Sequence, residues 1–131
     1  MRLLLDTHVA LWAISGDSRL PQKAYALIAA PENEVTVSAA SVWEISIKHA
    51  LARGQRNAMP VSGADALAYF REAGFTLLDV TPAHAAAVED LPPLHADPFD
   101  RMLVAQALSE PLRLVTRDSQ VAAYSDTIIE V

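Results

Sequence analysis

Four acidic residues are positioned in the sequence so that they could form one catalytic site. Each lies next to a short apolar run or within a helical pattern. They are Asp6, Glu44, Asp100 and Asp118. Ionised carboxylates that crowd together repel one another, and a divalent cation between them removes that repulsion. Mg²⁺ and Mn²⁺ prefer such oxygen ligands, and they can activate water and stabilise a phosphoryl group during displacement. If folding brings the four acids together, the sequence predicts metal-dependent cleavage of phosphodiester bonds.

Each acid also has a local structural explanation. Asp6 and Asp118 precede helical patterns, so both could be N-cap residues. Glu44 could complete a capping box with Ser41, or it could pair with Lys48 one helical turn later. Capping is a local requirement, however, and it does not explain why several acids should share one edge of a sheet. A shared position would therefore favour a joint role.

The stretch HADPFDRMLVAQAL, residues 95–108, contains two aspartates on either side of a Pro-Phe pair. Aspartate is a favoured N-cap, proline suits the first helical position, and an acid in the first turn complements the helix dipole. Asp97, Pro98 and Asp100 obey these rules in turn. The stretch by itself therefore does not separate a capping aspartate from a chemical one.

The acids can be placed because short apolar segments alternate with helical patterns along the chain. The expected strands cover residues 2–6, 35–38, 76–80, 112–116 and 127–131. The expected helices cover residues 7–15, 22–30, 40–54, 63–74, 82–91, 98–108 and 117–124. This alternation predicts an α/β fold, a three-layer α/β/α sandwich with a central, mostly parallel sheet. Because the carboxyl ends of parallel strands share one edge, we expect the four acids to meet there.

Length and composition narrow the class of protein. The 131 residues fit a single domain, residues 1–131, and the 52% hydrophobic content is that of a globular chain. A net charge of −6 argues against a surface that is basic throughout, and the lack of cysteine excludes disulfides and thiolate metal sites. Asp6 and His8 interrupt the first apolar run, and no run approaches the ~20 residues that cross a membrane. We therefore expect a cytoplasmic protein without a membrane segment.

Four segments, in order, resemble the signature segments of PIN-domain ribonucleases, especially the VapC-like toxins of bacterial toxin-antitoxin pairs. They are LLLDTHVALW, SAASVWEISIK, HADPFDRMLVAQA and LVTRDSQV, and the resemblance runs from residue 3 to about residue 124. It implies a small α/β/α sandwich that cleaves RNA with Mg²⁺ or Mn²⁺. The implied acidic quartet is Asp6, Glu44, Asp100 and Asp118, with Asp6 and Asp100 as principal metal ligands.

The resemblance also separates the two aspartates of the DPFD stretch. Asp100 matches the family acid that precedes the apolar helix, so Asp97 is expected to be mainly the helix cap. A supporting role beside the metal is implied for the Thr116 hydroxyl. An auxiliary role for Asp97 and His95 is the less favoured alternative.

Partners follow from the same resemblance. It implies an RNA substrate, an antitoxin encoded by a neighbouring gene that places a basic side chain among the acids, and a homodimer. Lys48 and Arg101 are candidates for the rim of an RNA groove. A helical stripe of Trp43, Ile47, Ala50 and Leu51 is most simply core, although a stripe of this kind can also receive an antitoxin.

Two other functions remain compatible with the residues. One is a catalytically silent binding module that uses the acidic site only to hold an ion or a basic segment. The other is an RNA-processing or DNA-directed nuclease of similar fold. The presence of all four acids favours an enzyme over the silent module.

Overall fold

A five-stranded sheet forms the centre of the molecule, which is described here by a computed structural model for residues 1–52 and 61–131. The strands lie in the order β3-β2-β1-β4-β5, and every pair of neighbours is parallel. Their bounds are Arg2–Leu5 for β1, Glu34–Ser38 for β2, Thr76–Leu78 for β3, Arg113–Thr116 for β4 and Ile129–Glu130 for β5. The parallel sheet predicted from the alternating pattern is thus confirmed.

Helices connect the strands, as the pattern predicts. They are α1 (Thr7–Ser15), α2 (Gln22–Ala29), α3 (Ala39–Leu51), α4 (Gly63–Glu72), α5 (Pro82–Ala87), α6 (Pro98–Ser109) and α7 (Ser119–Ala122). The expected helix 82–91 is shorter, because its last part forms a 3-10 turn at Val88–Asp90 ahead of two prolines. The expected end of helix 40–54 lies outside the described residues. Within the described ranges, no helix is long and apolar enough to span a membrane.

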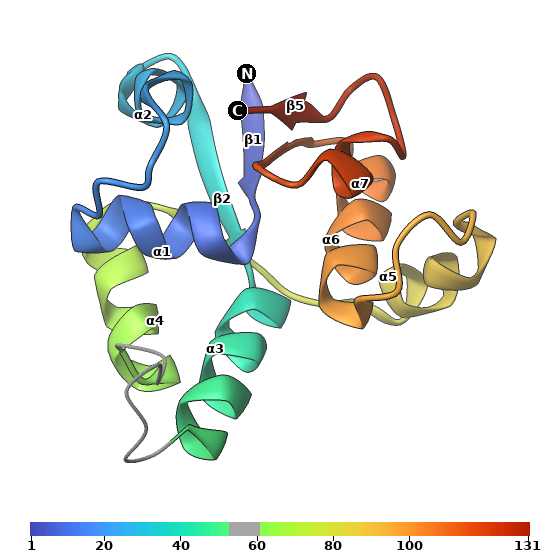
Figure 1. Cartoon of the computed structure of the whole chain (residues 1–131), viewed down its shortest axis with the longest axis horizontal. Helices are drawn as coiled ribbons and strands as arrows, with labels where there is room; N and C mark the ends of the chain where they lie inside the picture. The colour runs from blue at the N-terminus through green and yellow to red at the C-terminus, as the bar shows by residue number, and fades with distance from the viewer. Residues whose placement is uncertain (53–60) are drawn as a thin grey trace.

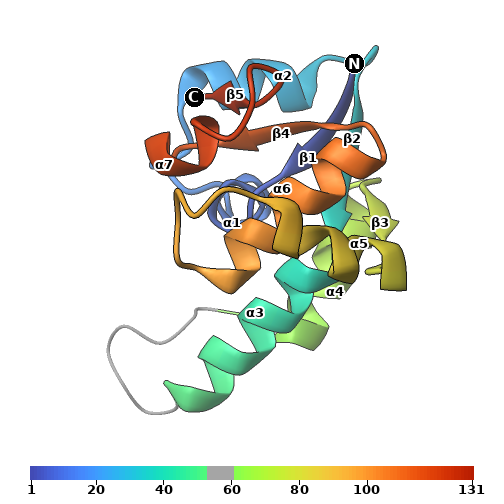
Figure 2. The same ribbon diagram turned by 90° about the vertical axis from the view of Figure 1, so that its right-hand side faces the viewer.

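Successive side chains of β1 enter two different cores, which explains the three layers. Leu3 and Leu5 pack with residues of α1, α2 and α4 on one face of the sheet. Leu4 packs with α6 and α7 on the other face. Figure 1 shows these two groups of helices on either side of the sheet, and Figure 2 shows α5, α6 and α7 on the second face. The alternation of strand side chains across a sheet therefore produces the predicted sandwich.

The strand order reverses direction between β1 and β4. The candidate site lies at the carboxyl edge of the sheet between these two strands. From β1 the chain proceeds through β2 to β3 on one side, whereas β4 and β5 lie on the other side. Leu5 is in register with Val115, and the backbone N–H of Asp6 donates to the carbonyl of Val115 at 3.0 Å. Ligands of open α/β sheets bind at the carboxyl edge beside such a switch point.

The buried face of α3 differs from the predicted one. Ala40 and Ile45 are buried and Glu44 is only 3% exposed, whereas Trp43 is 63% exposed and Leu51 is 76% exposed. The prediction that the stripe through Trp43 is core is therefore wrong. The helix follows β2 directly and turns the face that carries Glu44 toward the molecule, because that face packs beside α1 and α4. An apolar surface is left on the outside as a consequence.

Candidate active site

Asp6 serves both as a helix cap and as a buried acid at the switch point. It follows β1, and its Oδ1 accepts a hydrogen bond from the backbone N–H of Val9 at 2.9 Å. Its Oδ2 accepts a second bond from the Thr116 hydroxyl at 2.6 Å. Burial raises the pKa of the Asp6 carboxyl, and these two hydrogen bonds oppose the rise. One carboxylate therefore both caps α1 and contacts Thr116 at the switch point.

Thr116 connects two of the predicted acids. While its hydroxyl donates to Asp6, its Oγ1 accepts from the backbone N–H of Asp118 at 3.0 Å. Asp118 is itself the N-cap of α7, because its Oδ1 accepts from the backbone N–H of Gln120 at 2.8 Å. The Thr116 hydroxyl at the end of β4 thus contacts both the acid that follows β1 and the backbone of the acid that precedes α7.

Glu44 is buried within α3 and is satisfied by neighbours from two helices. The Thr7 hydroxyl donates to its Oε1 at 2.7 Å, and the Ser41 hydroxyl lies 2.9 Å from that of Thr7. The Lys48 ammonium contacts Oε2 at 2.5 Å, which confirms the predicted pair one turn apart. The N-cap of α3 is Ser38, so a capping box that starts at Ser41 does not form. A buried carboxylate without these partners would be costly.

The two aspartates of the DPFD stretch take different positions. Asp97 is the N-cap of α6, and its Oδ1 accepts from the backbone N–H groups of Phe99 at 2.8 Å and Asp100 at 3.1 Å. Asp100 lies in the first turn of the same helix. Burial raises the pKa of Asp100 to about 6, and the charges of Asp97, Asp6 and Glu44 add to the rise in that order. Acids from β1, α3 and α6 are therefore close enough to repel one another.

His95 lies at the site. The sequence by itself gives it an auxiliary role only as the less favoured alternative. Its Nε2 lies 3.0 Å from Oδ2 of Asp100 and 3.2 Å from Oδ2 of Asp118. One ligand atom from each of the three residues lies within 4.8 Å of the others. In the sequence, its position just before the DPFD stretch indicates a place near Asp100, but only the fold brings it close to Asp118. Thr7 is a second member that sequence reasoning missed, since its only signal is its position after Asp6.

Arg101 is a candidate for RNA contact, but its guanidinium is occupied within the chain. It donates to the carbonyls of Val88 at 3.1 Å and Pro92 at 3.0 Å, and to the Tyr124 hydroxyl at 3.0 Å. These bonds fasten the segment between α5 and α6 to the start of α6. RNA contact by Arg101 stays a prediction, as it does for Lys48.

The residues at this edge fit a divalent cation of the hard type. Carboxylate oxygens predominate among the possible ligand atoms. Burial raises the pKa of Asp100, and the neighbouring negative charges, which a cation would offset, raise it further. Oxygen-rich sites with few nitrogen ligands suit Mg²⁺ or Mn²⁺ better than Zn²⁺. Such an arrangement can hold a phosphate group and activate water beside it.

The fold and the site together define an α/β/α domain whose acids gather at the switch point of a parallel sheet. The chain belongs to the PIN-domain family, whose profile matches residues 3–126. It is 32% identical over 123 residues to ribonuclease VapC22 of Mycobacterium tuberculosis, covering 93% of this chain and 91% of that protein. The resemblance inferred from the four segments is thereby confirmed.

Solved structures agree on the fold. VapBC2 of Rickettsia felis, crystallised with a DNA fragment from its promoter, matches with a TM-score of 0.70 at 16% identity, covering 100% of this chain and 98% of that one. VapC20 of Mycobacterium tuberculosis, a toxin that cleaves the Sarcin-Ricin loop, matches with a TM-score of 0.66 at 20% identity, covering 98% of each chain. At these identities the likeness establishes the shared fold.

The capping role of Asp97 predicts a measurable loss of stability. Asp97→Ala removes an acceptor for two backbone N–H groups, so we expect the free energy of unfolding to fall by ~1 kcal/mol. Asp97→Asn is the matched control, because asparagine retains the oxygen acceptor and should stay close to the wild type. Urea unfolding of the three proteins measures this. A fully stable Asp97→Ala variant would contradict the assignment.

The raised pKa of Asp100 predicts a pH-dependent gain from its substitution. Near pH 4 the carboxyl is largely protonated in the folded chain, whereas at neutral pH it is ionised in both states and folding moves the charge to a site that raises its pKa to about 6. After allowance for solvent screening, this opposition costs on the order of 2 kcal/mol. With chelator present, Asp100→Asn should therefore raise the melting temperature at neutral pH and have little effect near pH 4. Equal effects in thermal unfolding at both pH values would refute this explanation.

Proposed function

We propose that this protein is a metal-dependent endoribonuclease that acts as the toxin of a toxin-antitoxin pair. The observation that carries the proposal is the meeting of acids from β1, α3, α6 and α7 at the switch point of a PIN-domain fold. Similarity to a ribonuclease along nearly the whole chain supports the same reaction. We further propose that the protein acts on RNA in the cytoplasm.

In this proposal Asp6 and Asp100 are the principal ligands of the cation, and Glu44 and Asp118 complete the site or orient the attacking water. A bound Mg²⁺ or Mn²⁺ supplies charge stabilisation at the phosphate and lowers the pKa of water. The protein contributes prepared carboxylates: the Thr116 hydroxyl fixes Oδ2 of Asp6, and the Thr7 hydroxyl fixes Oε1 of Glu44. Hydrogen bonds of this kind orient ligands before the cation arrives.

Contact with RNA has to be local because the chain carries a net charge of −6. Lys48 is the proposed contact, since its ammonium lies at the site and its side chain is 43% exposed. There it both offsets the buried charge of Glu44 and offers a donor to a phosphate. Arg101 would contribute to RNA binding indirectly, because its hydrogen bonds hold the loop between α5 and α6.

The proposed chemistry predicts that single acids are indispensable. Asp6→Asn and Asp100→Asn each remove a ligand charge, so we expect both variants to lose at least ~100-fold in cleavage of total RNA while remaining folded. Glu72→Gln, an exposed substitution at the end of α4, is the matched control and should remain fully active. Asp97→Ala should retain most of its activity as a cap variant.

The readout is gel analysis of RNA incubated with each purified protein, with and without excess chelator. Circular dichroism confirms that each variant is folded. Full activity in either site variant, or undiminished activity in chelator, would exclude the mechanism. Cleavage of DNA in preference to RNA would replace the ribonuclease with a nuclease of another specificity.

An antitoxin is the partner that we propose for the acidic site. The structural matches include toxin-antitoxin complexes of Rickettsia felis, Klebsiella pneumoniae and Salmonella typhimurium. An arginine from the antitoxin could bridge two of the carboxylates in a bidentate manner and compete with the cation for them. Binding of the antitoxin would then lower both metal affinity and cleavage.

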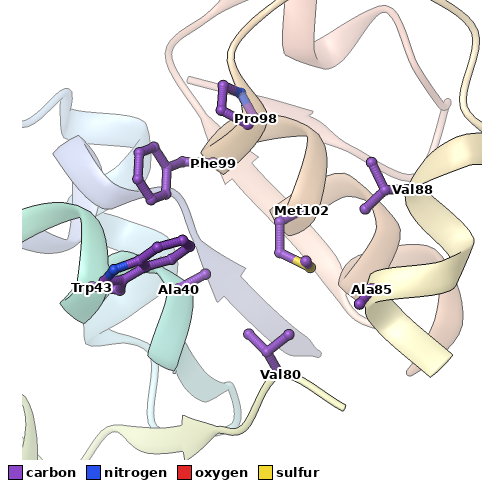
Figure 3. A pocket seen from close by; sticks show the side chains of 8 residues that line it. All are labelled: Ala40, Trp43, Val80, Ala85, Val88, Pro98, Phe99 and Met102. Atoms are coloured by element: carbon purple, nitrogen blue, oxygen red, sulfur yellow. The ribbon is translucent and has the colours of Figure 1, made fainter. Parts of the chain in front are cut away.

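We also propose a homodimer, and the apolar surface beside α3 is the candidate interface. A pocket there has a volume of about 450 Å³. Figure 3 shows the side chains that line it: Ala40, Trp43, Val80, Ala85, Val88, Pro98, Phe99 and Met102. The rings of Trp43 and Phe99 meet edge to face, 5.2 Å between centroids. Exposed apolar surfaces of this kind mark places where another chain packs.

The partner proposals predict the outcome of one co-expression experiment. The chain and the product of its neighbouring gene should purify together, and the complex should bind Mn²⁺ and cleave RNA at least ~10-fold less well than the free chain. Light scattering of the free chain should give the mass of a dimer, which Trp43→Glu should reduce to that of a monomer. A neighbour that does not bind, or that binds without lowering either quantity, would remove the toxin assignment and leave the nuclease.

A further inference from the structure

Lys48 is the one residue of the described chain whose ammonium contacts a proposed metal-binding acid. Its Nζ lies 2.5 Å from Oε2 of Glu44, one helical turn earlier on α3. The Glu44 side chain is buried, with 4% of its surface exposed, whereas 43% of the Lys48 side chain is exposed. A partly exposed cation therefore compensates a buried carboxylate at the site.

The two oxygens of Glu44 have different partners. Oε1 accepts the Thr7 hydroxyl at 2.7 Å, a neutral donor from the first turn of α1, whereas Oε2 accepts the Lys48 ammonium. A buried carboxylate without a countercharge is costly, so the ammonium at Oε2 stabilises the metal-free chain. Oε2 is also the oxygen that Glu44 can offer to a divalent cation, because Oε1 is held by the packing of α1 against α3.

Glu44 lies close enough to the proposed principal ligands to share a cation with them. Burial is the largest cause of the raised pKa of both Asp6 and Asp100, and the charge of Glu44 adds to the rise in each. A cation held by Asp6 and Asp100 would therefore also attract the Glu44 carboxylate.

A divalent cation and the ammonium repel each other if both stay on Oε2. Mg²⁺ binds oxygen at a distance of about 2 Å, so with the ammonium in place the two positive charges would lie within about 5 Å of each other. The ammonium is the group that can move, because its stem is flexible and partly exposed and because water hydrates an ammonium strongly. Glu44 is held by its burial and by Thr7.

We propose that Lys48 is a resident counter-ion of the metal site, whose ammonium neutralises Oε2 of Glu44 in the metal-free chain and gives up this oxygen when a divalent cation binds. The inference rests on the proposed function, because it assumes that the acids bind such a cation. It makes the ammonium and the cation competitors for one oxygen. Metal binding then also frees the ammonium for contact with an RNA phosphate.

Nuclear magnetic resonance of the wild type tests the exchange without any substitution. The chain has only two lysines, Lys23 and Lys48, so their ammonium signals in ¹⁵N-labelled protein are easily distinguished. In saturating MgCl₂ the protons of the Lys48 ammonium should exchange with water several-fold faster than in chelator. Lys23 donates to the carbonyl of Glu130 at 3.0 Å and should not change. An equally protected Lys48 ammonium in MgCl₂ would overturn the proposal.

Three variants test the competition by metal affinity. Lys48→Met keeps most of the stem and removes the charge, so isothermal titration calorimetry with MnCl₂ alone should show affinity raised ~5-fold or more. Lys23→Met is the matched control, because it removes the same charge from α2 and should stay within about twofold of the wild type. Lys48→Arg keeps a cation beside Glu44 and should gain no affinity.

Thermal unfolding gives a second readout and shows whether each variant is folded. In chelator, Lys48→Met should melt at a lower temperature than the wild type, because Glu44 loses its countercharge, and MnCl₂ should raise its melting temperature by more. Unchanged or weaker Mn²⁺ affinity in Lys48→Met would overturn the proposal, as would an equal gain in Lys23→Met. If Lys48→Met does not fold, the proton exchange of the wild type decides.

Asp100→Asn separates failure of this inference from failure of the proposed function. If Asp100→Asn loses Mn²⁺ affinity while Lys48→Met gains none, only the role of Lys48 is refuted. If the wild type binds no Mn²⁺, or if Asp100→Asn binds it equally well, the metal site and the inference built on it both fail.

Discussion

The burial of several carboxylates close together at the carboxyl edge of the sheet is the constraint on which the site depends. Burial raises the pKa of Asp100 to about 6, and the charges of Asp97, Asp6 and Glu44 add to that rise. Nothing in the packing of an apolar core requires such an arrangement, and it opposes folding of the metal-free chain at neutral pH. A site that is retained at this cost is typical of function.

Polar groups of the protein lie against each of the four acids. A threonine hydroxyl donates to Asp6, a threonine hydroxyl and an ammonium contact Glu44, and an imidazole nitrogen lies between the carboxylates of the remaining pair. These groups come from β4, α1, α3 and the loop before α6. Because the acids and the groups that contact them come from several elements, the site is complete only when both faces of the sheet are packed.

Capping and a place among the gathered acids compete as explanations of the sequence, but the structure combines them in single residues. Asp6 and Asp118 each use Oδ1 to cap a helix and leave Oδ2 for the site. Asp97 places its cap on Oδ1 as well, and its charge adds to the pKa of Asp100. The backbone N–H groups at a helix N-terminus therefore hold one carboxylate oxygen of the acid and leave the other oxygen directed away from the helix. This dual use explains why a local test of each acid could not decide its role.

The sequence by itself determined the order of strands and helices along the chain, because the period of the apolar residues distinguishes a strand from a helix. It also predicted the cap at Asp97 and proposed the four acids as a site, since strand ends and helix starts can be read locally and a parallel sheet brings them to one edge. It failed for the exposed face of α3, where Trp43 and Leu51 look like core residues, because periodicity does not say which apolar stripe meets the rest of the protein. Only the tertiary structure placed His95 between Asp100 and Asp118, and Thr116 beside Asp6. These contacts join segments that are distant in the chain. They depend on the pairing of β1 with β4 and on the packing of α7 beside α6, which no local pattern reports.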